Sequence, residues 1–324
     1  MAQGSLSGPA DWVNAVAFSP SGTMLAAGTS DNRVFVWNLA TRSLTAQLPH
    51  EDPVTSLAWD GQARLAAGDG DGTVSVWSLP APVLMAGTPV NSVAFSPAGS
   101  LLAVGSQTLQ LWNPVTRAPV ATAAPSGTFV NAVAFAPSGR MVAAGYGNGM
   151  VQLYAASGAA LGPPVRASAA GPVEYVAFSP SGQVMATGGD DGTARLWSVS
   201  GSAVRPLAVV HDSGTYVYSV TFSPDGKTLA AGVTDGTVWL WNLAIPGHPS
   251  LKATISGPNG HVYSVAFSPS GRVLAAGSAD GTVRLWDTSP AAATAAVCAG
   301  AGQPLTRLEW ANYVPGLAYR APCS

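Results

Sequence analysis

Residues 253–287 read ATISGPNGHVYSVAFSPSGRVLAAGSADGTVRLWD, and this stretch decides how we expect the chain to fold. Four short segments alternate apolar with small or polar residues, a pattern that predicts half-buried strands: 253–255, 261–267, 273–277 and 282–286. Pro269 fixes its own φ and Gly271 allows a positive φ, so the residues between the second and third segments predict a tight turn. The stretch therefore predicts a four-stranded antiparallel unit that cannot bury both of its faces alone.

The same unit recurs along most of the chain. An aromatic residue precedes the tight turn in every copy: Phe18, Trp59, Phe95, Phe135, Phe178, Phe222 and Phe267. Another aromatic residue ends the last strand of each copy: Trp37, Trp77, Trp112, Tyr154, Trp197, Trp241 and Trp286. Successive members of this second series are 40, 35, 42, 43, 44 and 45 residues apart. Seven units of four strands at this period predict an all-β, seven-bladed β-propeller over residues 1–287.

The dipeptides Gly260-His261 and Trp286-Asp287 complete this pattern, and with them the chain resembles the WD-repeat family of β-propellers. The resemblance implies a non-catalytic scaffold or sensor that binds a protein or peptide partner. It also implies that a His, a Ser, the turn Asp and the Trp of a blade form a hydrogen-bonded column. Only the last blade carries all four by matching positions: His261, Ser278, Asp280 and Trp286. A structural hydrogen bond is favoured over a catalytic His261–Asp280 dyad.

The ends of the repeat region predict how the ring closes. Residues 4–13 align without a gap on residues 253–262, which carry the outer strand of the sixth copy and its turn. We therefore expect residues near Ser5–Ser7 to supply the outermost strand of the last blade, as is common in the family, because closure removes open sheet edges. Each second strand carries small residues and a Gly, as in Leu25–Gly28, which predicts a close approach of neighbouring sheets.

Residues 288–324 predict a second unit, a tail docked on the propeller. Thr306 and Glu309 have capping-box spacing, so a short helix is expected over 307–313. Cys298 and Cys323 could form a disulfide, although an intracellular setting argues against a lasting one. The tail resembles the segment that follows WD-repeat propellers in bacterial signal-transducing ATPases and Ser/Thr kinases, through these residues: Cys298, Ala299, Leu305, Thr306, Glu309, Trp310, Tyr313, Pro315, Tyr319 and Cys323.

Composition argues against several functional classes. The formal net charge is −2, which gives no basic surface for nucleic acid. No apolar run is long enough to span a membrane, and the start of the chain has no secretory pattern. Frequent Ala and scarce Lys suggest a GC-rich bacterial genome. We expect a cytoplasmic monomer with no cofactor. We also expect no metal site, because the four His lack metal-ligand spacing and two Cys cannot form a tetrahedral site alone.

The residue just inside each first strand is expected to border the ring face that usually contacts a partner. The predicted partner-binding face consists of Asn14, Thr55, Asn91, Asn131, Glu174, Asp190, Tyr216, Tyr218 and Tyr263. Exposed Tyr is a frequent interface anchor, so blades five to seven are expected to carry the contact. Three alternatives stay open: the Tyr side chains cap the channel and contact water, the channel mouth holds an enzyme site, or the propeller is a structural spacer in a larger protein.

Overall fold

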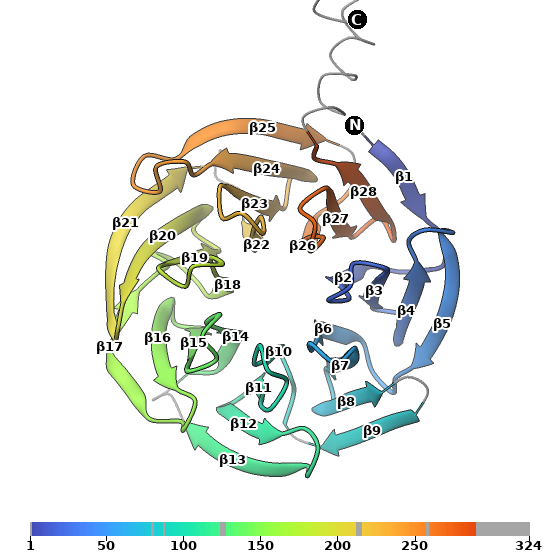
Figure 1. The fold of residues 1–324 in the computed structure, drawn as a ribbon, viewed down its shortest axis with the longest axis horizontal. Helices are drawn as coiled ribbons and strands as arrows, with labels where there is room; N and C mark the ends of the chain where they lie inside the picture. Colours follow the sequence, from blue (N-terminus) through green and yellow to red (C-terminus); the bar gives the residue numbers. More distant parts are fainter. Residues whose placement is uncertain are drawn as a thin grey trace, which may run out of the picture.

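The computed structural model describes residues 2–78, 81–86, 88–123, 128–211, 216–256 and 259–289. Within them, seven four-stranded antiparallel sheets stand around a central axis, each twisted like a propeller blade (Figure 1). No helix occurs in this part of the chain, and none there could cross a membrane. The predicted all-β, seven-bladed propeller is confirmed. The predicted tail helix over 307–313 and the cysteines Cys298 and Cys323 lie outside the described residues.

Each blade contributes its strands in order from the channel to the rim. The innermost strands are β2 (Val13–Phe18), β6 (Val54–Trp59), β10 (Ser92–Phe95), β14 (Val130–Phe135), β18 (Val173–Phe178), β22 (Val217–Phe222) and β26 (Val262–Phe267). The second strands are β3 (Met24–Thr29), β7 (Arg64–Asp69), β11 (Leu102–Gly105), β15 (Met141–Tyr146), β19 (Val184–Gly189), β23 (Thr228–Val233) and β27 (Val273–Ser278).

The outer half of each blade follows the same order. The third strands are β4 (Arg33–Asn38), β8 (Thr73–Ser78), β12 (Leu109–Asn113), β16 (Met150–Ala155), β20 (Thr193–Ser200), β24 (Thr237–Asn242) and β28 (Val283–Asp287). The rim strands are β5 (Ser43–Pro49), β9 (Ala81–Ala86), β13 (Ala118–Ala123), β17 (Ala160–Arg166), β21 (Ala203–His211), β25 (Ser250–Ser256) and β1 (Ala2–Leu6).

Strand β1 closes the ring, as the alignment of the two chain regions predicted. It pairs antiparallel with β28, so that Ser5 lies opposite Arg284 and Leu6 opposite Val283. Leu6 is buried, and Trp37 of the first blade donates its indole N–H to the Ser7 carbonyl at 3.0 Å. Strands from the two ends of the propeller therefore complete one sheet, and β1 covers the edge that β28 would otherwise expose (Figure 1).

The repeated glycines of the second strands lie where neighbouring blades approach most closely. A Cβ on Gly277 would be 2.5 Å from Cγ1 of Val13 in the first blade. The same atom on Gly28 would be 2.4 Å from Cγ1 of Val54. Real Cβ atoms do not come this close to another carbon, so only Gly fits, as the sequence predicted. The ends of the third strands carry the compensating bulk, because Trp37 and Trp286 are 1% and 2% exposed.

Blade four solves the same packing problem with different residues. Tyr154 replaces the third-strand Trp, and Tyr146 stands where the last blade has Ser278. The two phenol oxygens are 2.5 Å apart in the buried interior. Blade five keeps the Trp, and the indole N–H of Trp197 donates to the Thr187 hydroxyl at 3.0 Å. In blade four, the larger Tyr146 at the position of Ser278 thus accompanies the smaller ring of Tyr154.

The opposite ends of the channel carry different connections. We call the end at which the chain enters the innermost strands the entry end, and the other, which carries the turns between first and second strands, the turn end. In the first blade, Ser19 accepts a hydrogen bond from the Met24 N–H at 3.0 Å, and Gly22 has a φ of 69°. In the last blade, Ser268 accepts from Val273 at 3.0 Å. Local turn chemistry therefore fixes the turn end.

Candidate functional site

A β-bulge turns one side chain of the innermost strand into the channel. In six blades the pairing of first and second strands shifts between the first and third residues of the innermost strand. The residue skipped by the pairing is the second one, and bulges often redirect a side chain in this way. In blade three the equivalent residue, Asn91, precedes β10 and donates its N–H to the Gly105 carbonyl at 2.8 Å.

These seven residues, which we call the channel ring, line one cavity of about 270 Å³. They are Asn14, Thr55, Asn91, Asn131, Glu174, Tyr218 and Tyr263. Tyr175 also faces this cavity and is 38% exposed. The structure thus brings together seven of the nine residues that the sequence placed on the partner-binding face. The other two, Asp190 and Tyr216, contact members of the ring as described below.

In blades one to four the ring residue connects its blade to the next one. The Asn14 amide donates to the Val54 carbonyl at 3.0 Å. Further along, the Thr55 hydroxyl donates to Val90 at 2.7 Å, Asn91 to Val130 at 3.0 Å, and Asn131 to Val173 at 3.2 Å. Each bond satisfies a backbone carbonyl at the start of the neighbouring innermost strand, so these four side chains stabilise the ring.

A second series of contacts between blades involves serines that the sequence analysis did not single out. Ser56 accepts a hydrogen bond from the Val93 N–H at 3.0 Å, and Ser92 accepts from Val133 at 3.1 Å. The same contact joins the sixth blade to the seventh and the seventh to the first: Ser219 to Val265 and Ser264 to Val16, both at 3.1 Å. The recurrence of Ser two residues after the first strand residue could have indicated these contacts.

Blades five to seven lack the first kind of connection within the described residues. Glu174, Tyr218 and Tyr263 occupy the ring positions there, and no side-chain hydrogen bond to the next blade's carbonyl is found from any of them. Glu174 instead accepts a hydrogen bond from Asn131, and a phenol extends past the short distance that an Asn or Thr side chain spans. These three side chains are therefore free of the structural role that their counterparts serve.

Glu174 and Asp190 form a carboxylate pair at the entry end of blade five. Burial is the main reason why the pKa of Glu174 is raised to about 7, and the neighbouring Asp190 carboxylate raises it further, against the lowering effect of a hydrogen bond from Asn131. Burial also raises the pKa of Asp190, although its hydrogen bond with Glu174 acts in the opposite direction. The raised pKa values mean that two negative charges on the pair are disfavoured near neutral pH, and neither member takes part in an ion pair of the described residues.

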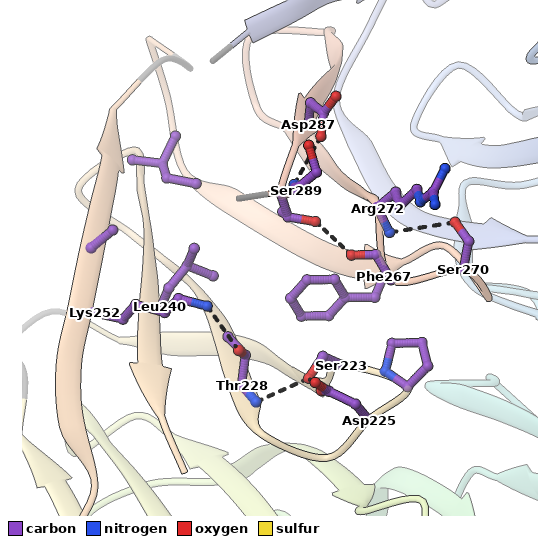
Figure 2. Close-up of a pocket in the computed structure, with 15 residues that line it drawn as sticks. Ser223, Asp225, Thr228, Leu240, Lys252, Phe267, Ser270, Arg272, Asp287 and Ser289 are labelled. Atoms are coloured by element: carbon purple, nitrogen blue, oxygen red, sulfur yellow. Dashed lines mark hydrogen bonds between the residues drawn. The ribbon is translucent and has the colours of Figure 1, made fainter. Parts of the chain in front are cut away.

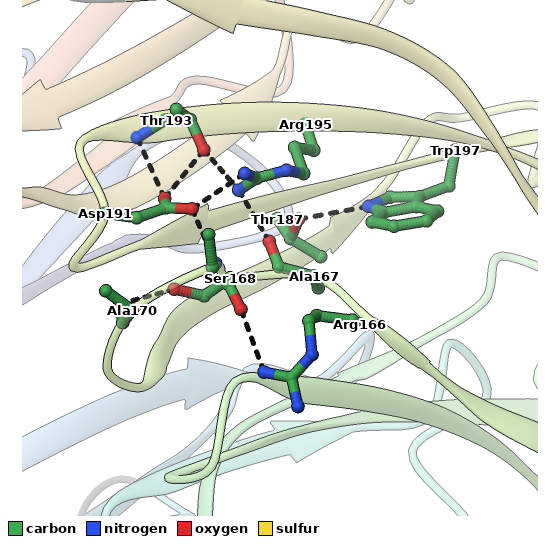
Figure 3. A network of polar contacts seen from close by, with 10 residues as sticks. Arg166, Ala167, Ser168, Ala170, Thr187, Asp191, Thr193, Arg195 and Trp197 are labelled. Carbon is green, nitrogen blue, oxygen red and sulfur yellow. Dashed lines mark hydrogen bonds and ion pairs between the residues drawn. The ribbon is translucent and has the colours of Figure 1, made fainter.

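The charge next to this pair is already compensated. Asp191 lies 2.7 Å from Arg195, which also donates to the Ala167 carbonyl at 2.8 Å (Figure 3). The Ala169 N–H donates to the same carboxylate at 2.7 Å. Burial tends to raise the pKa of Asp191, but these hydrogen bonds and the Arg195 charge lower it below its usual value. Arg195 thus neutralises Asp191, and no cation of the described part of the chain forms an ion pair with the acid pair.

Five rings form an aromatic patch at the entry end, which consists of Trp12, Tyr216, Tyr218, His261 and Tyr263. Tyr218 is central, with ring centroids 5.2 Å from Tyr263 and 6.3 Å from both Tyr216 and His261. Trp12 continues the patch onto the first blade, 5.9 Å from Tyr263. Trp12 and Tyr216 are 50% and 47% exposed, so the patch is open to a partner.

The aromatic patch adjoins the acid pair. Burial is the main cause of the raised pKa of Tyr218, and the charges of Glu174 and Asp190 contribute to it. An electrostatic effect of this kind requires the groups to lie close together. Aromatic faces and unpaired carboxylates thus share one side of the channel mouth, over blades five, six, seven and one.

The residues of the predicted column in the last blade make a different set of bonds. Asp280 donates its N–H to Ser278 at 3.2 Å, and its carboxylate lies 3.1 Å from Arg284. Ser278 in turn donates to the Gly260 carbonyl at 3.2 Å. Trp286 is buried between the last two blades. These contacts hold the second turn of the blade.

His261 faces the neighbouring blade. Its Nδ1 lies 2.5 Å from the carbonyl oxygen of Thr234 in blade six, and no bond to Asp280 is found. The ring instead packs 6.0 Å from Tyr263 as a member of the aromatic patch. Because His261 immediately precedes β26, it lies at the entry end beside the 278–282 turn, where its backbone carbonyl accepts from the Ala279 N–H at 2.9 Å.

Blade two contains a buried His that the alignment of blades overlooked. Nδ1 of His50 lies 2.8 Å from the Asp69 carboxylate, and the two side chains are 2% and 0% exposed. The His50 ring meets the edge of Trp77 at a centroid distance of 5.1 Å. Blade two therefore contains a His–Asp contact beside its third-strand Trp, although the matching positions predict the four-residue column for the last blade alone. His50 lies four residues before Val54, whereas the position that matches His261 in blade two is Pro53, which directly precedes β6.

The described residues contain no group of three or more His, Cys, Asp or Glu side chains that could hold a metal ion. A comparison with protein families finds two matches. Residues 12–242 match the model described as IFT122 first beta-propeller. Residues 249–287 match the model described as WD domain, G-beta repeat. A search of curated proteins finds no match.

Proposed function

The chain belongs to the WD-repeat β-propeller family, to which the matched IFT122 first-propeller model also belongs, and from this premise we propose that it binds a protein segment with a cationic side chain. Propellers of this family typically serve as non-enzymatic scaffolds for protein–protein interaction. The observation that carries the proposal is the unpaired acid pair beside the aromatic patch at the entry end.

Charge supports a cationic partner group. The pKa values of both Glu174 and Asp190 are raised, so two negative charges are disfavoured there, and a guanidinium or ammonium group placed between them would allow both to ionise. Hydrogen bonds from such a group to a carboxylate are stronger than neutral ones. Binding would release a proton, so the affinity should increase as the pH rises from 6 to 8.

The aromatic patch supports the same partner. A cation within about 6 Å of a Tyr or Trp face is attracted by the ring quadrupole. Tyr and Trp also offer large contact areas at low entropic cost, which makes them frequent interface anchors. The exposed rings of Trp12 and Tyr216 would contact the residues on either side of the cationic one.

The proposal can be tested with a peptide array. Each peptide carries one variable central residue, Arg, Lys, Gln or Glu, in an otherwise identical neutral sequence, and retention of the purified full chain is measured. We expect Arg and Lys peptides to be retained best. Tyr218→Ala and Tyr263→Ala should each weaken retention by about 1–3 kcal/mol, or roughly 5- to 150-fold.

Phe129→Ala provides the matched control. Phe129 occupies in blade four the position of Tyr216, and it is also an exposed aromatic residue, at 38%. No contact of Phe129 with the acid pair or with the aromatic patch is found among the described residues, so its replacement should leave retention unchanged. Equal retention of Gln and Arg peptides would refute the cationic partner. If a variant with both Tyr218→Ala and Tyr263→Ala melts like the parent and retains the peptides equally well, the binding site lies on another surface.

A role in signalling rests on the resemblance of the tail residues to segments of bacterial signal-transducing proteins. In that setting the propeller would be the sensor module, and a partner bound at the entry end would be its input. A cytoplasmic location and a monomeric state fit this role. Size-exclusion chromatography with light scattering of the full chain measures the oligomeric state directly.

A further inference from the structure

One position at the turn end is occupied differently in the last blade. The residue two places after the third-strand aromatic donates its N–H across the blade to the residue that follows the turn Gly. Leu39 donates to Thr23 at 2.9 Å, and Leu243 donates to Lys227 at 2.8 Å. Thr288 of the last blade makes the same bond to Arg272 at 2.8 Å. The backbone geometry is thus shared, and only the side chain differs.

In other blades this residue fills the gap toward the preceding blade. Leu39 packs into the core between the seventh and first blades, where it joins Leu6 and Phe18. Val199 and Leu243, 6% and 3% exposed, belong to the clusters before blades five and six. Blades three and four have Pro114 and Ala156 at this position. An apolar side chain is therefore the rule among the blades described here.

Thr288 cannot fill the gap in the same way. Its hydroxyl donates to the Gly271 carbonyl at 2.6 Å, which holds the short side chain against the turn of its own blade. A cavity of about 1120 Å³ lies between blades six and seven, and Thr288 is one of the residues that line it. Leu240 lines one side and Phe267 the other (Figure 2). Ile255, only 8% exposed, completes the apolar lining.

The last residue that the structure describes lies at this cavity. Ser289 lines it, and the sequence continues with residues 290–324 (Figure 2). Residues 305–319 read LTRLEWANYVPGLAY, a run that is rich in large apolar and aromatic residues. As a flexible chain, the 15 intervening residues 290–304 would span about 20–23 Å on average, so the apolar run can return to the point of exit.

We propose that residues 305–319 dock in the cavity between blades six and seven and supply the apolar side chain that Thr288 does not. Because the segment is tethered at Ser289, which lines the cavity, its effective concentration is in the millimolar range, and weak contacts suffice to hold it. Trp310 and Tyr313 are the residues of this run best suited to the cavity, because their rings can pack on its apolar part while the indole N–H and the phenol reach its polar lining. The site is on the turn end, so it leaves the entry end available to a partner.

Hydrogen exchange of the full chain, followed by mass spectrometry, tests this proposal. Peptides covering 305–319 should exchange at least tenfold more slowly than the same residues in an isolated synthetic peptide. Thr288→Leu places in the last blade the side chain found at Leu39 and Leu243, so it should compete with the tail and restore fast exchange. Thr288→Ser keeps the hydroxyl without filling the gap, and it should retain the protection.

A second variant covers the case in which Thr288→Leu does not fold. The double substitution Trp310→Ala and Tyr313→Ala changes only the tail, and it should raise exchange both in 305–319 and in peptides covering Leu240, Ile255 and Phe267. Fast exchange of 305–319 in the parent chain would overturn the proposal. Protection that survives Thr288→Leu in a folded protein, or tail variants that leave the cavity peptides unaffected, would overturn it as well.

Discussion

The two arcs of the channel ring use the same backbone position for different purposes. In blades one to four, Asn or Thr reaches from this position to the next blade and satisfies a carbonyl. In blades five to seven, Glu174, Tyr218 and Tyr263 hold it and gather beside Asp190 and the exposed rings of the entry end. The bulge that presents the side chain is common to both arcs, so side-chain chemistry alone separates a structural contact from an available surface.

The difference shows where a repeat protein can change without losing its fold. In blades five to seven, which we call the aromatic arc, Ser219 and Ser264 keep their contacts to the following blades. The glycines of every second strand keep theirs as well. The ring residue is therefore redundant for closure in blades six and seven. A position whose structural contact can be dispensed with is one that is open to a binding role.

The largest effect is expected where the aromatic arc meets the first blade through the closing strand. Deletion of residues 1–8 removes β1, the buried Leu6 and the bond from Trp37 to Ser7, and exposes β28 as an edge. We expect a loss of about 4 kcal/mol or more in the free energy of unfolding, together with aggregation. Thermal melting and light scattering measure both. A deleted protein as stable and as monomeric as the parent would disprove closure by this strand.

A smaller effect is expected from breaking the contacts of the first arc. Asn91→Ala together with Asn131→Ala removes the donors to Val130 and Val173. The double variant should lose about 2–3 kcal/mol of stability, because buried carbonyls lose their partners. Urea unfolding provides the measurement. Tyr218→Ala serves as the comparison at a position without such a bond, and it should cost clearly less. Equal losses in the two arcs would erase the distinction between them.

The smallest effect is expected in the pH dependence of stability. The folded-state pKa of Glu174 is raised to about 7, so the stability that it contributes is present below its ordinary pKa and is lost as the pH rises through 7. Glu174→Gln should therefore gain about 1–2 kcal/mol relative to the parent between pH 5 and 8. Urea unfolding at several pH values tests this expectation.

Glu51→Gln is the control for that measurement, because Glu51 is an exposed side chain. It should follow the parent at every pH. A Glu174→Gln protein with the pH profile of the parent would show that the acid pair carries no proton at neutral pH. It would also remove the electrostatic reason to expect a cationic partner.

Sequence reasoning reached the ring residues because their position repeats, but it could not assign their roles. The spacing of Asn91 and Tyr218 from their turns is conserved between the copies, so both were placed at one end of the ring. Whether a side chain bonds to the next blade depends on a distance across two sheets, which no local pattern encodes. The pairing of His50 with Asp69 was missed for a related reason, because a loop of variable length carries His50 into the blade.

The sequence by itself determined the blade count, the strand order, the turns, the aromatic spacers and the closing strand. Each of these follows from local preferences repeated at a fixed period, and repetition makes a weak signal decisive. Only the tertiary structure decided which ring residues connect blades and that the acid pair lies beside the aromatic patch. It also decided that Thr288 borders a cavity where Leu39 fills a core. These properties depend on contacts between blades, and therefore on the curvature that all seven sheets set together.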